Sequence, residues 1–292
     1  MTASANATGL HVRKPVLNVR ATPLIWSRIP EFSIGWNGSS ICIPFYEHYL
    51  CNVAKSVRDQ CCGDNPGLRD QLDDFIRQEG THARYHSEFN RRFLDGGNPD
   101  LEAIVHDLVA SLQTLRKERS LAYNMAFCAG FENTATYSAL YLFQHCDDLF
   151  EGADPNGVNL FLWHVAEEFE HRSVCHDAFA AISGSYVTRI AGLAHSFRHI
   201  GGFFDRAIDV VLRQWQEGLS ESERKESQRR HRALKRRQNR FILPRLGTLL
   251  NPRFDPARFV VPPKIEHALT HFAGASPVTE HFNETWASHA FA

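Results

Sequence analysis

The sequence predicts an all-α protein, a four-helix bundle with additional C-terminal helices. Apolar residues recur with helical spacing in several long segments, whereas the strict alternation that is typical of strands is scarce. Clusters of proline, glycine and asparagine separate these segments, and the chain contains no internal repeat or low-complexity tract. With 43% hydrophobic and 22% charged residues, the composition is that of an ordinary globular protein, and the length of 292 residues suits one large domain or a domain with an appendage.

The four major helices are expected in two pairs. The first pair covers residues 41–61 and 68–93, and the second pair covers residues 120–145 and 158–182. A shorter connecting helix is expected between the pairs, over residues 101–115. Pro-Gly, Asp-Gly-Gly and Asp-Pro-Asn-Gly motifs, which interrupt helices, fall between the segments.

The two ends of the chain have a different character from the bundle. Residues 1–38 carry scattered prolines and glycines and predict an extended N-terminal arm. Residues 39–219 are assigned to the bundle, with one or two amphipathic helices over 185–219. Residues 220–292 begin with a highly charged helix over 220–240 and continue as a tail punctuated by prolines.

Charge and cysteine content exclude several classes of protein. The formal net charge of −1 shows no bias toward nucleic acid or an acidic membrane. Seven cysteines without a CxxC pair indicate reduced thiols rather than a disulfide framework. No apolar run reaches the roughly 18 residues that a membrane span needs, and the N-terminus lacks a signal-peptide pattern. We therefore expect a cytoplasmic protein that neither binds nucleic acid nor inserts stably into a membrane.

Basic residues are frequent between positions 225 and 240. They could contact nucleic acid or a membrane surface. Glutamates are mixed into the start of this run, which favours a solvated helix face as its interpretation.

Carboxylates and histidines recur in a fixed order along the four major helices. The first and third helices each offer one glutamate, and the second and fourth each offer an ExxH pair: Glu47, then Glu79 with His82, then Glu132, then Glu168 with His171. Residues i and i+3 share one helix face, so a carboxylate and an imidazole can reach the same ion. This is the ligand order of di-iron carboxylate bundles. Oxygen-rich sets with a few imidazoles suit iron or manganese more than zinc.

The distances along the chain support the same interpretation. The 32 residues from Glu47 to Glu79 and the 36 residues from Glu132 to Glu168 suit two antiparallel hairpins with their ligands at equal depth. The 53 residues between Glu79 and Glu132 leave room for one long crossover. Burying four carboxylates without a cation would cost several kcal/mol each. A metal centre is therefore the favoured reading.

A third histidine lies on the fourth helix. His164 precedes Glu168 by four residues, so that His164, Glu168 and His171 form an HxxxExxH motif on one face. His164 is either a seventh protein ligand or a histidine that packs near Trp163 at the edge of the bundle.

Further residues near the motifs are candidates for supporting the ligands or facing the substrate. These are His86, which follows an ExxH histidine by four residues, with Tyr85 and Thr136. Glu167 and Glu170 point away from the ligand face and are expected to meet solvent or a neighbouring helix.

Two stretches carry a resemblance to a known family. FIRQEGTHARYHSEFN (75–90) and WHVAEEFEHRSVCHDAF (163–179) resemble the bacterial family called predicted metal-dependent hydrolases. The resemblance covers roughly residues 28–260. The family belongs to the ferritin-like group, so a ferritin-like bundle is implied.

The ligand order is also similar to that of the arylamine N-oxygenases, which convert amino groups to nitro groups. That resemblance is confined to the ligands. It implies that Glu79 and Glu168 bridge two metals. It also implies that one metal is completed by Glu47 and His82, and the other by Glu132, His171 and His164.

These observations predict a non-haem di-iron oxidase or oxygenase of the monooxygenase or N-oxygenase type. It would use two iron ions, with manganese or a mixed pair as the alternative, O2 as co-substrate and an external electron donor such as a reductase. The substrate would be a small molecule, in a biosynthetic pathway if the reaction is N-oxygenation, and the assembly could be a homodimer. Two rivals stay open: a hydrolase that uses a metal-activated water, and a non-enzymatic iron-binding protein.

Overall fold

The computed structural model describes residues 10–61, 63, 65–274, 277–279, 281–283 and 285–286. Within these residues the protein is all-α, as predicted, and the β contact found is an isolated bridge between Val16 and Pro277. None of the described helices has the length and hydropathy needed to cross a membrane.

The helices begin where the sequence supplies caps. Asn65, Asn98 and Asp154 each precede a proline and accept hydrogen bonds from backbone amides of the first turn. The elements are α1 (Pro30–Cys61), α2 (Pro66–Leu94), α3 (Pro99–Glu118), α4 (Leu121–His145), α5 (Asp147–Phe150), α6 (Pro155–His171), α7 (Val174–Ile182), α8 (Tyr186–Glu217), α9 (Glu221–Leu249), the 3₁₀ turn η1 (Pro256–Arg258) and α10 (Pro263–His271).

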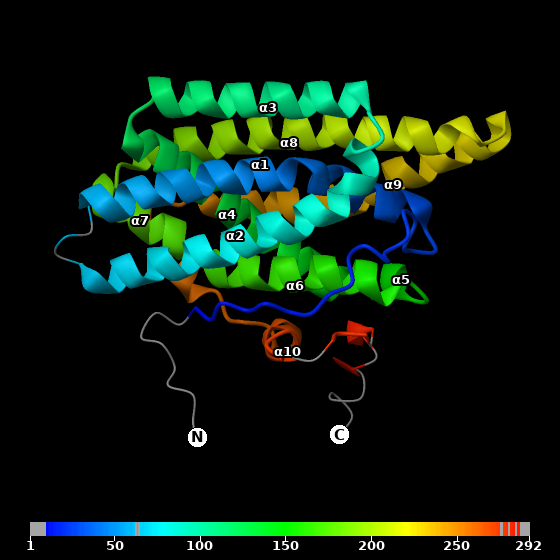
Figure 1. Ribbon diagram of the computed structural model, residues 1–292. Coiled ribbons are helices and arrows are strands. Elements are labelled where there is room, and N and C mark those ends of the chain that lie inside the picture. Colours follow the sequence, from blue (N-terminus) through cyan, green and yellow to red (C-terminus); the bar gives the residue numbers. More distant parts are fainter. Residues whose placement is uncertain are drawn as a thin grey trace.

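The four helices α1, α2, α4 and α6 carry the candidate ligands and surround the centre of the molecule. Helix α1 packs against α2, and α4 packs against α6 and α7. The long helix α8 lies along α1 and α4, and α3 covers α1 and α8 from the outside (Figure 1). Helices α8 and α9 form a hairpin that extends beyond the bundle at one end (Figure 1). Helix α3 is the predicted connecting helix between the two pairs.

The N-terminal segment and α10 cover the outer side of α6 (Figure 1). The Arg13 side chain donates a hydrogen bond to the carbonyl of Leu269 in α10 at 2.8 Å. The Val278 amide donates to the Val16 carbonyl at 3.0 Å. Segments from both ends of the sequence are therefore held together against one helix.

Helix α1 begins at Pro30, so the extended arm predicted over residues 1–38 is wrong for its last part; residues 1–9 lie outside the described residues. Proline suits the first helical turn, where its missing amide hydrogen is not needed. One glycine that suggested a loop has another explanation. A Cβ at Gly38 would lie 2.6 Å from the Cα of Ile208 in α8, so this glycine lets the two helices touch.

Three other expected boundaries differ from the structure. The predicted helix 158–182 is divided into α6 and α7 at Arg172 and Ser173. The charged helix continues past residue 240 to Leu249, with Pro244 inside it, because Phe241 and Ile242 beside the proline are buried. The tail contains one more helix, α10. Of the one or two helices expected over residues 185–219, the structure has one, α8 (Tyr186–Glu217).

Helices α4 and α8 approach each other at backbone distance. A Cβ at Gly130 would lie 2.6 Å from the Cα of Leu193, and a Cβ at Gly192 would lie 2.5 Å from the carbonyl carbon of Ala126. Real Cβ atoms do not come this close to a neighbouring backbone, so the two glycines fix the spacing of these helices. Gly130 lies two residues before Glu132, so this contact also positions a candidate ligand.

Gly192→Ala is expected to destabilise the protein by about 1–3 kcal/mol, because the added methyl group must push α8 away from α4. Chemical denaturation followed by circular dichroism measures the effect. Gly202→Ala in the same helix is the control. A Cβ at Gly202 has no neighbour within 4 Å, so helix propensity should leave it neutral or more stable by up to about 1 kcal/mol. Equal effects of both substitutions would contradict the close-packing explanation.

Candidate metal centre

The seven predicted ligand residues converge at the centre of the bundle. Their ligand atoms form two groups, and within each group all atoms lie within 4.8 Å of one another. One group contains Glu47, His82, His164 and Glu168, and the other contains Glu79, Glu132, Glu168 and His171. Each of the seven residues is at most 6% exposed. Glu168 belongs to both groups and lies between them.

In the first group, two imidazole nitrogens face two carboxylates. His82 Nδ1 lies 3.9 Å from Glu47 Oε1 and 3.6 Å from Glu168 Oε1. His164 Nε2 lies 3.6 Å from Glu47 Oε1 and 3.0 Å from Glu168 Oε1. Glu79 Oε2 is also near, 3.8 Å from His82 Nδ1, so Glu79 reaches toward both groups.

In the second group, one imidazole nitrogen faces three carboxylates. His171 Nδ1 lies 2.8 Å from Glu79 Oε1 and 3.7 Å from both Glu132 Oε2 and Glu168 Oε1. The short contact to Glu79 lacks hydrogen-bond geometry. It is a contact between two groups that face the same point.

The donor set fits divalent cations because its polar atoms are left without partners. Within the described residues, the buried atoms without a hydrogen-bond partner include both oxygens of Glu47, Oε1 of Glu79, Oε2 of Glu132 and of Glu168, and Nδ1 of His82 and of His171. An unsatisfied buried polar group costs about 1–3 kcal/mol, more if charged. So many at one point indicate bound cations rather than a polar network complete in itself.

The pKa directions of three of these carboxylates also indicate bound cations. Burial, together with the neighbouring carboxylates, raises the pKa of Glu47 and of Glu132 well above the usual range. Burial would also raise the pKa of Glu168, but the surrounding imidazoles of His164, His171 and His82 outweigh it and hold that pKa well below the usual range. Two of these carboxylates therefore favour the protonated form and one favours the ionised form. All of them can be ionised together only if positive charge lies between them.

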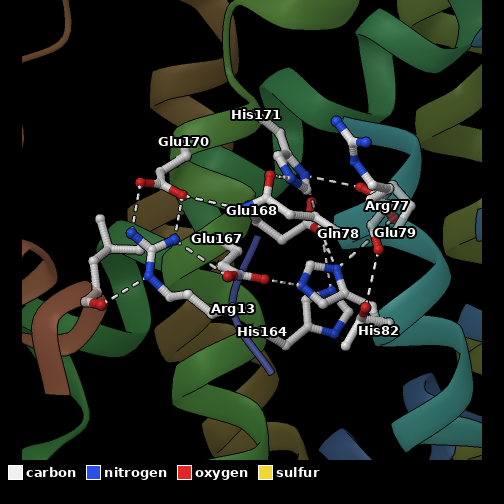
Figure 2. A network of polar contacts seen from close by, with 12 residues as sticks. Arg13, Arg77, Gln78, Glu79, His82, His164, Glu167, Glu168, Glu170 and His171 are labelled. Atoms are coloured by element: carbon white, nitrogen blue, oxygen red, sulfur yellow. Dashed lines mark hydrogen bonds and ion pairs between the residues drawn. The ribbon is translucent and has the colours of Figure 1, made fainter. Parts of the chain in front are cut away.

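The second nitrogen of His82 is held by a buried ion pair. His82 Nε2 lies 2.8 Å from Glu167 Oε2, and Arg13 donates to Glu167 Oε1 at 3.2 Å and to Glu170 at 2.7 Å (Figure 2). Burial opposes ionisation of Glu167, but His82 and Arg13 lower its pKa, so its carboxylate only accepts hydrogen bonds. Nε2 must therefore carry a hydrogen, so that in the neutral imidazole that a metal ion requires the lone pair is on Nδ1, facing the carboxylates.

The second nitrogen of His171 is held by an amide. Gln78 Nε2 donates to the His11 carbonyl at 3.1 Å and to Glu170 at 3.2 Å, which fixes the orientation of the amide. Gln78 Oε1 then accepts a hydrogen bond from His171 Nε2 at 3.0 Å. In the neutral imidazole the lone pair of His171 is then on Nδ1, which faces the second group.

The second nitrogen of His164 ends a directed chain of hydrogen bonds. Asn90 Nδ2 donates to the Ser40 carbonyl at 2.6 Å, so Asn90 Oδ1 accepts the Ser40 hydroxyl hydrogen at 2.7 Å. Having donated its only hydrogen, the hydroxyl must accept one from His86 Nδ1 at 2.7 Å. Burial and the nearby histidines lower the pKa of His86 well below its usual value. Neutral His86 Nε2 therefore accepts from His164 Nδ1 at 2.5 Å, which leaves the lone pair of His164 Nε2 toward Glu47 and Glu168.

The structure corrects one expected grouping. His164 lies with Glu47 and His82, not with Glu132 and His171 as the N-oxygenase resemblance implied. The reason is helical geometry. His164 and His171 are one turn on either side of Glu168, so they are about 10 Å apart along α6 and face opposite ends of the cluster.

The supporting residues are partly those expected. His86 contacts His164, as described above. The Tyr85 hydroxyl instead donates to the Pro15 carbonyl, and its ring packs on Trp163 with centroids 5.1 Å apart. The Thr136 hydroxyl donates to the Glu132 carbonyl one turn back at 2.9 Å.

Several residues that hold the ligands were not predicted. Arg13, Gln78, Ser40 and Asn90 were not singled out. Glu167, expected to meet solvent or a neighbouring helix, is 0% exposed and contacts His82 of α2. The position of Glu167 around α6 was predictable, but the N-terminal segment that brings Arg13 over that face gives no sequence signal. The available signal for Glu167 was indirect: an ExxH histidine that binds a metal through one nitrogen needs a hydrogen-bond acceptor for the other nitrogen, and a nearby acidic residue can be that acceptor.

Comparison with known proteins identifies the family. The sequence model of the family described as predicted metal-dependent hydrolase matches residues 11–259. No curated protein and no solved structure matches the chain significantly. The match includes the segment with Arg13 and all seven residues of the cluster, so the chain belongs to the family of predicted metal-dependent hydrolases.

Proposed function

We propose that this metal-dependent protein is a non-haem di-iron oxidase or oxygenase on a ferritin-like bundle. The observation that carries the proposal is the pair of buried groups that share Glu168, with four carboxylates and three imidazoles in all. Oxygen-rich, mixed sets of this kind suit iron or manganese better than zinc. The ordered ligand series on four helices is that of di-iron carboxylate bundles.

In this proposal each ligand has a defined place. Glu47, His82 and His164 would hold one ion, Glu132 and His171 would hold the other, and Glu79 and Glu168 would lie between them. Two iron ions would supply the redox chemistry that activates dioxygen, with electrons from an external donor. A small-molecule substrate and a reductase as electron source belong to the same proposal.

The chain's own residues would exclude water and fix protons. Trp163 packs edge-on against His82 with centroids 4.9 Å apart, and Phe75 does the same to His171 at 4.7 Å. These rings keep bulk water from the imidazoles. Glu167, Gln78 and His86 hold the hydrogens of the three imidazoles on the nitrogens that face away from the cluster, so the inner nitrogens stay available as ligands.

Hydrolysis is the second candidate, and the family description is the observation that favours it. A pair of divalent ions in the same groups could lower the pKa of a bound water and deliver it to a substrate. The two functions differ in what they require. Oxidation needs dioxygen and a reductant, whereas hydrolysis needs neither.

Glu168→Ala is expected to lose both ions, because this carboxylate belongs to both groups. The purified iron-loaded chain should hold about two ions per chain by elemental analysis, and the variant fewer than one. Glu102→Ala, an exposed glutamate in the first turn of α3, is the control and should keep the full content. Retention of both ions by folded Glu168→Ala would contradict the shared position.

Oxygen consumption separates the two candidate functions. The reduced iron-loaded protein, mixed with air-saturated buffer, should consume oxygen in an electrode measurement, and the zinc-loaded protein should not. A hydrolase would instead cleave p-nitrophenyl esters or phosphates under nitrogen with zinc or manganese bound, and Glu168→Ala would abolish that cleavage. Metal-dependent cleavage of these substrates without oxygen consumption would contradict the oxidase proposal and favour the hydrolase.

His86→Phe is expected to weaken the binding of one of the two ions by about 10- to 100-fold, because His164 loses the acceptor that orients it. Titration against a chelator measures the affinity. His86→Gln, whose side-chain oxygen can accept the same hydrogen bond, should restore part of it. His106→Phe in α3, where His106 is 83% exposed, should change nothing. Unchanged affinity in His86→Phe would contradict the hydrogen-bond chain.

A further inference from the structure

A cavity of about 620 Å³ opens beside the cluster, between α1, α4, α8 and α9. His164 and Glu168 form part of its inner wall, together with His86. Oε2 of Glu168 is buried and has no hydrogen-bond partner among the described residues. The size falls within the roughly 300–1,000 Å³ that small-molecule sites occupy.

The walls of the cavity are mainly aromatic and aliphatic. Seven phenylalanine, tryptophan and tyrosine side chains from four helices contribute to them: Phe32, Trp36, Phe131, Tyr141, Phe161, Phe197 and Phe204. Aliphatic residues of α8 and α9, such as Ile208 and Leu234, complete the wall. Hydroxyl and amide groups, such as those of Ser138, Gln238 and Asn239, lie among them. A molecule that fills this space must still present mainly hydrocarbon surface, because polar groups placed against the apolar part of the wall would lose their hydration without replacement hydrogen bonds.

Glycines widen the cavity. Gly35 in α1 and Gly201 and Gly202 in α8 line it, and a Cβ at any of them would meet nothing within 4 Å. They differ from Gly38, where a Cβ would press on α8. A glycine inside a helix costs about 0.5–1 kcal/mol relative to alanine. These three do not serve close packing, and what they provide is open volume next to the cluster.

The charged groups of the cavity wall are largely paired. Arg230 binds both oxygens of Glu31, at 2.9 and 3.0 Å, and Lys235 pairs with Asp205 at 2.7 Å. Arg198 lines the rim and is exposed. Charge is therefore present at the rim and neutralised along the wall, so the wall itself is suited to an uncharged body.

The rim carries two exposed hydrophobic side chains. Phe197 of α8 is 44% exposed and Leu243 of α9 is 48% exposed, and both also line the cavity. Large hydrophobic side chains at the surface of a concave site are typical of entrances for apolar ligands. They mark an opening between α8 and α9.

We propose that this cavity is the substrate site and that it takes a mainly hydrocarbon molecule whose buried part is uncharged. The molecule enters past Phe197 and Leu243, and its inner end lies at His164 and Glu168. The inference rests on the proposed function for what happens to that end. Binding itself requires neither dioxygen nor electrons.

Dye binding to the iron-loaded full-length chain under nitrogen tests the site. The probe is N-phenyl-1-naphthylamine, an uncharged dye whose fluorescence rises in apolar surroundings. Its fluorescence should rise saturably, and 1-decanol should displace it whereas succinate, charged at both ends, should not. Absence of a saturable rise, or displacement by succinate in preference to 1-decanol, would overturn the substrate class.

Two variants fill the cavity from opposite walls. Gly201→Phe and Gly35→Leu should each raise the dissociation constant of the dye by about tenfold, because the new side chain occupies the space of the ligand. Gly247→Phe is the control, since Gly247 is exposed in α9, is absent from the cavity wall and has open space for a Cβ. It should bind the dye like the unmodified chain. Undiminished binding in both cavity variants would place the dye elsewhere and overturn the assignment.

Measurements of the iron content and circular dichroism of each variant check whether the cluster and the fold are intact. Dye binding without oxygen consumption would leave the cavity assignment standing and remove the oxidase proposal. Oxygen consumption without dye binding would support the oxidase proposal and remove the cavity assignment. The two proposals therefore fail independently.

Discussion

The structure depends on the burial of four carboxylates at one point in a helical bundle. Glu47, Glu79, Glu132 and Glu168 are each at most 3% exposed, and their oxygens face one another rather than water. Such a cluster is costly unless cations lie within it. Among the described residues, the buried glutamates Glu31 and Glu167 have arginine partners, Arg230 and Arg13, whereas the four carboxylates of the cluster have no cationic Lys or Arg partner.

Three separate supports orient the imidazoles of this cluster. Glu167 with Arg13 holds His82, Gln78 holds His171, and the chain of His86, Ser40 and Asn90 holds His164. In each case the direction of the hydrogen bonds leaves the inner nitrogen with its lone pair. The supports come from the N-terminal segment, α1, α2 and α6, so segments far apart in the sequence must be in place before the donor set is complete.

The helices that follow the bundle turn a metal cluster into a site with access. Helix α8 is held against α4 and α1 by close glycine contacts at Gly130, Gly192 and Gly38, whereas Gly35 and Gly201 leave space beside the cluster. Helix α9 closes the outer wall and is tied to α1 through Arg230 and Glu31. Glycine therefore allows close helix packing at some positions and leaves open space at others, depending on whether another helix lies opposite.

The sequence by itself determined the helical class, the order of the major helices and the candidate ligands. This was possible because periodicity, caps and i, i+3 spacing are local properties, so Glu79 with His82 and Glu168 with His171 could be recognised along the chain. Tertiary structure alone decided that Gly38 serves helix contact rather than a loop, that His164 joins Glu47 and His82, and that Arg13 reaches Glu167. It also decided which glycines line the cavity. Each of these depends on which segment packs opposite a residue, and contacts between segments distant in sequence leave no local pattern.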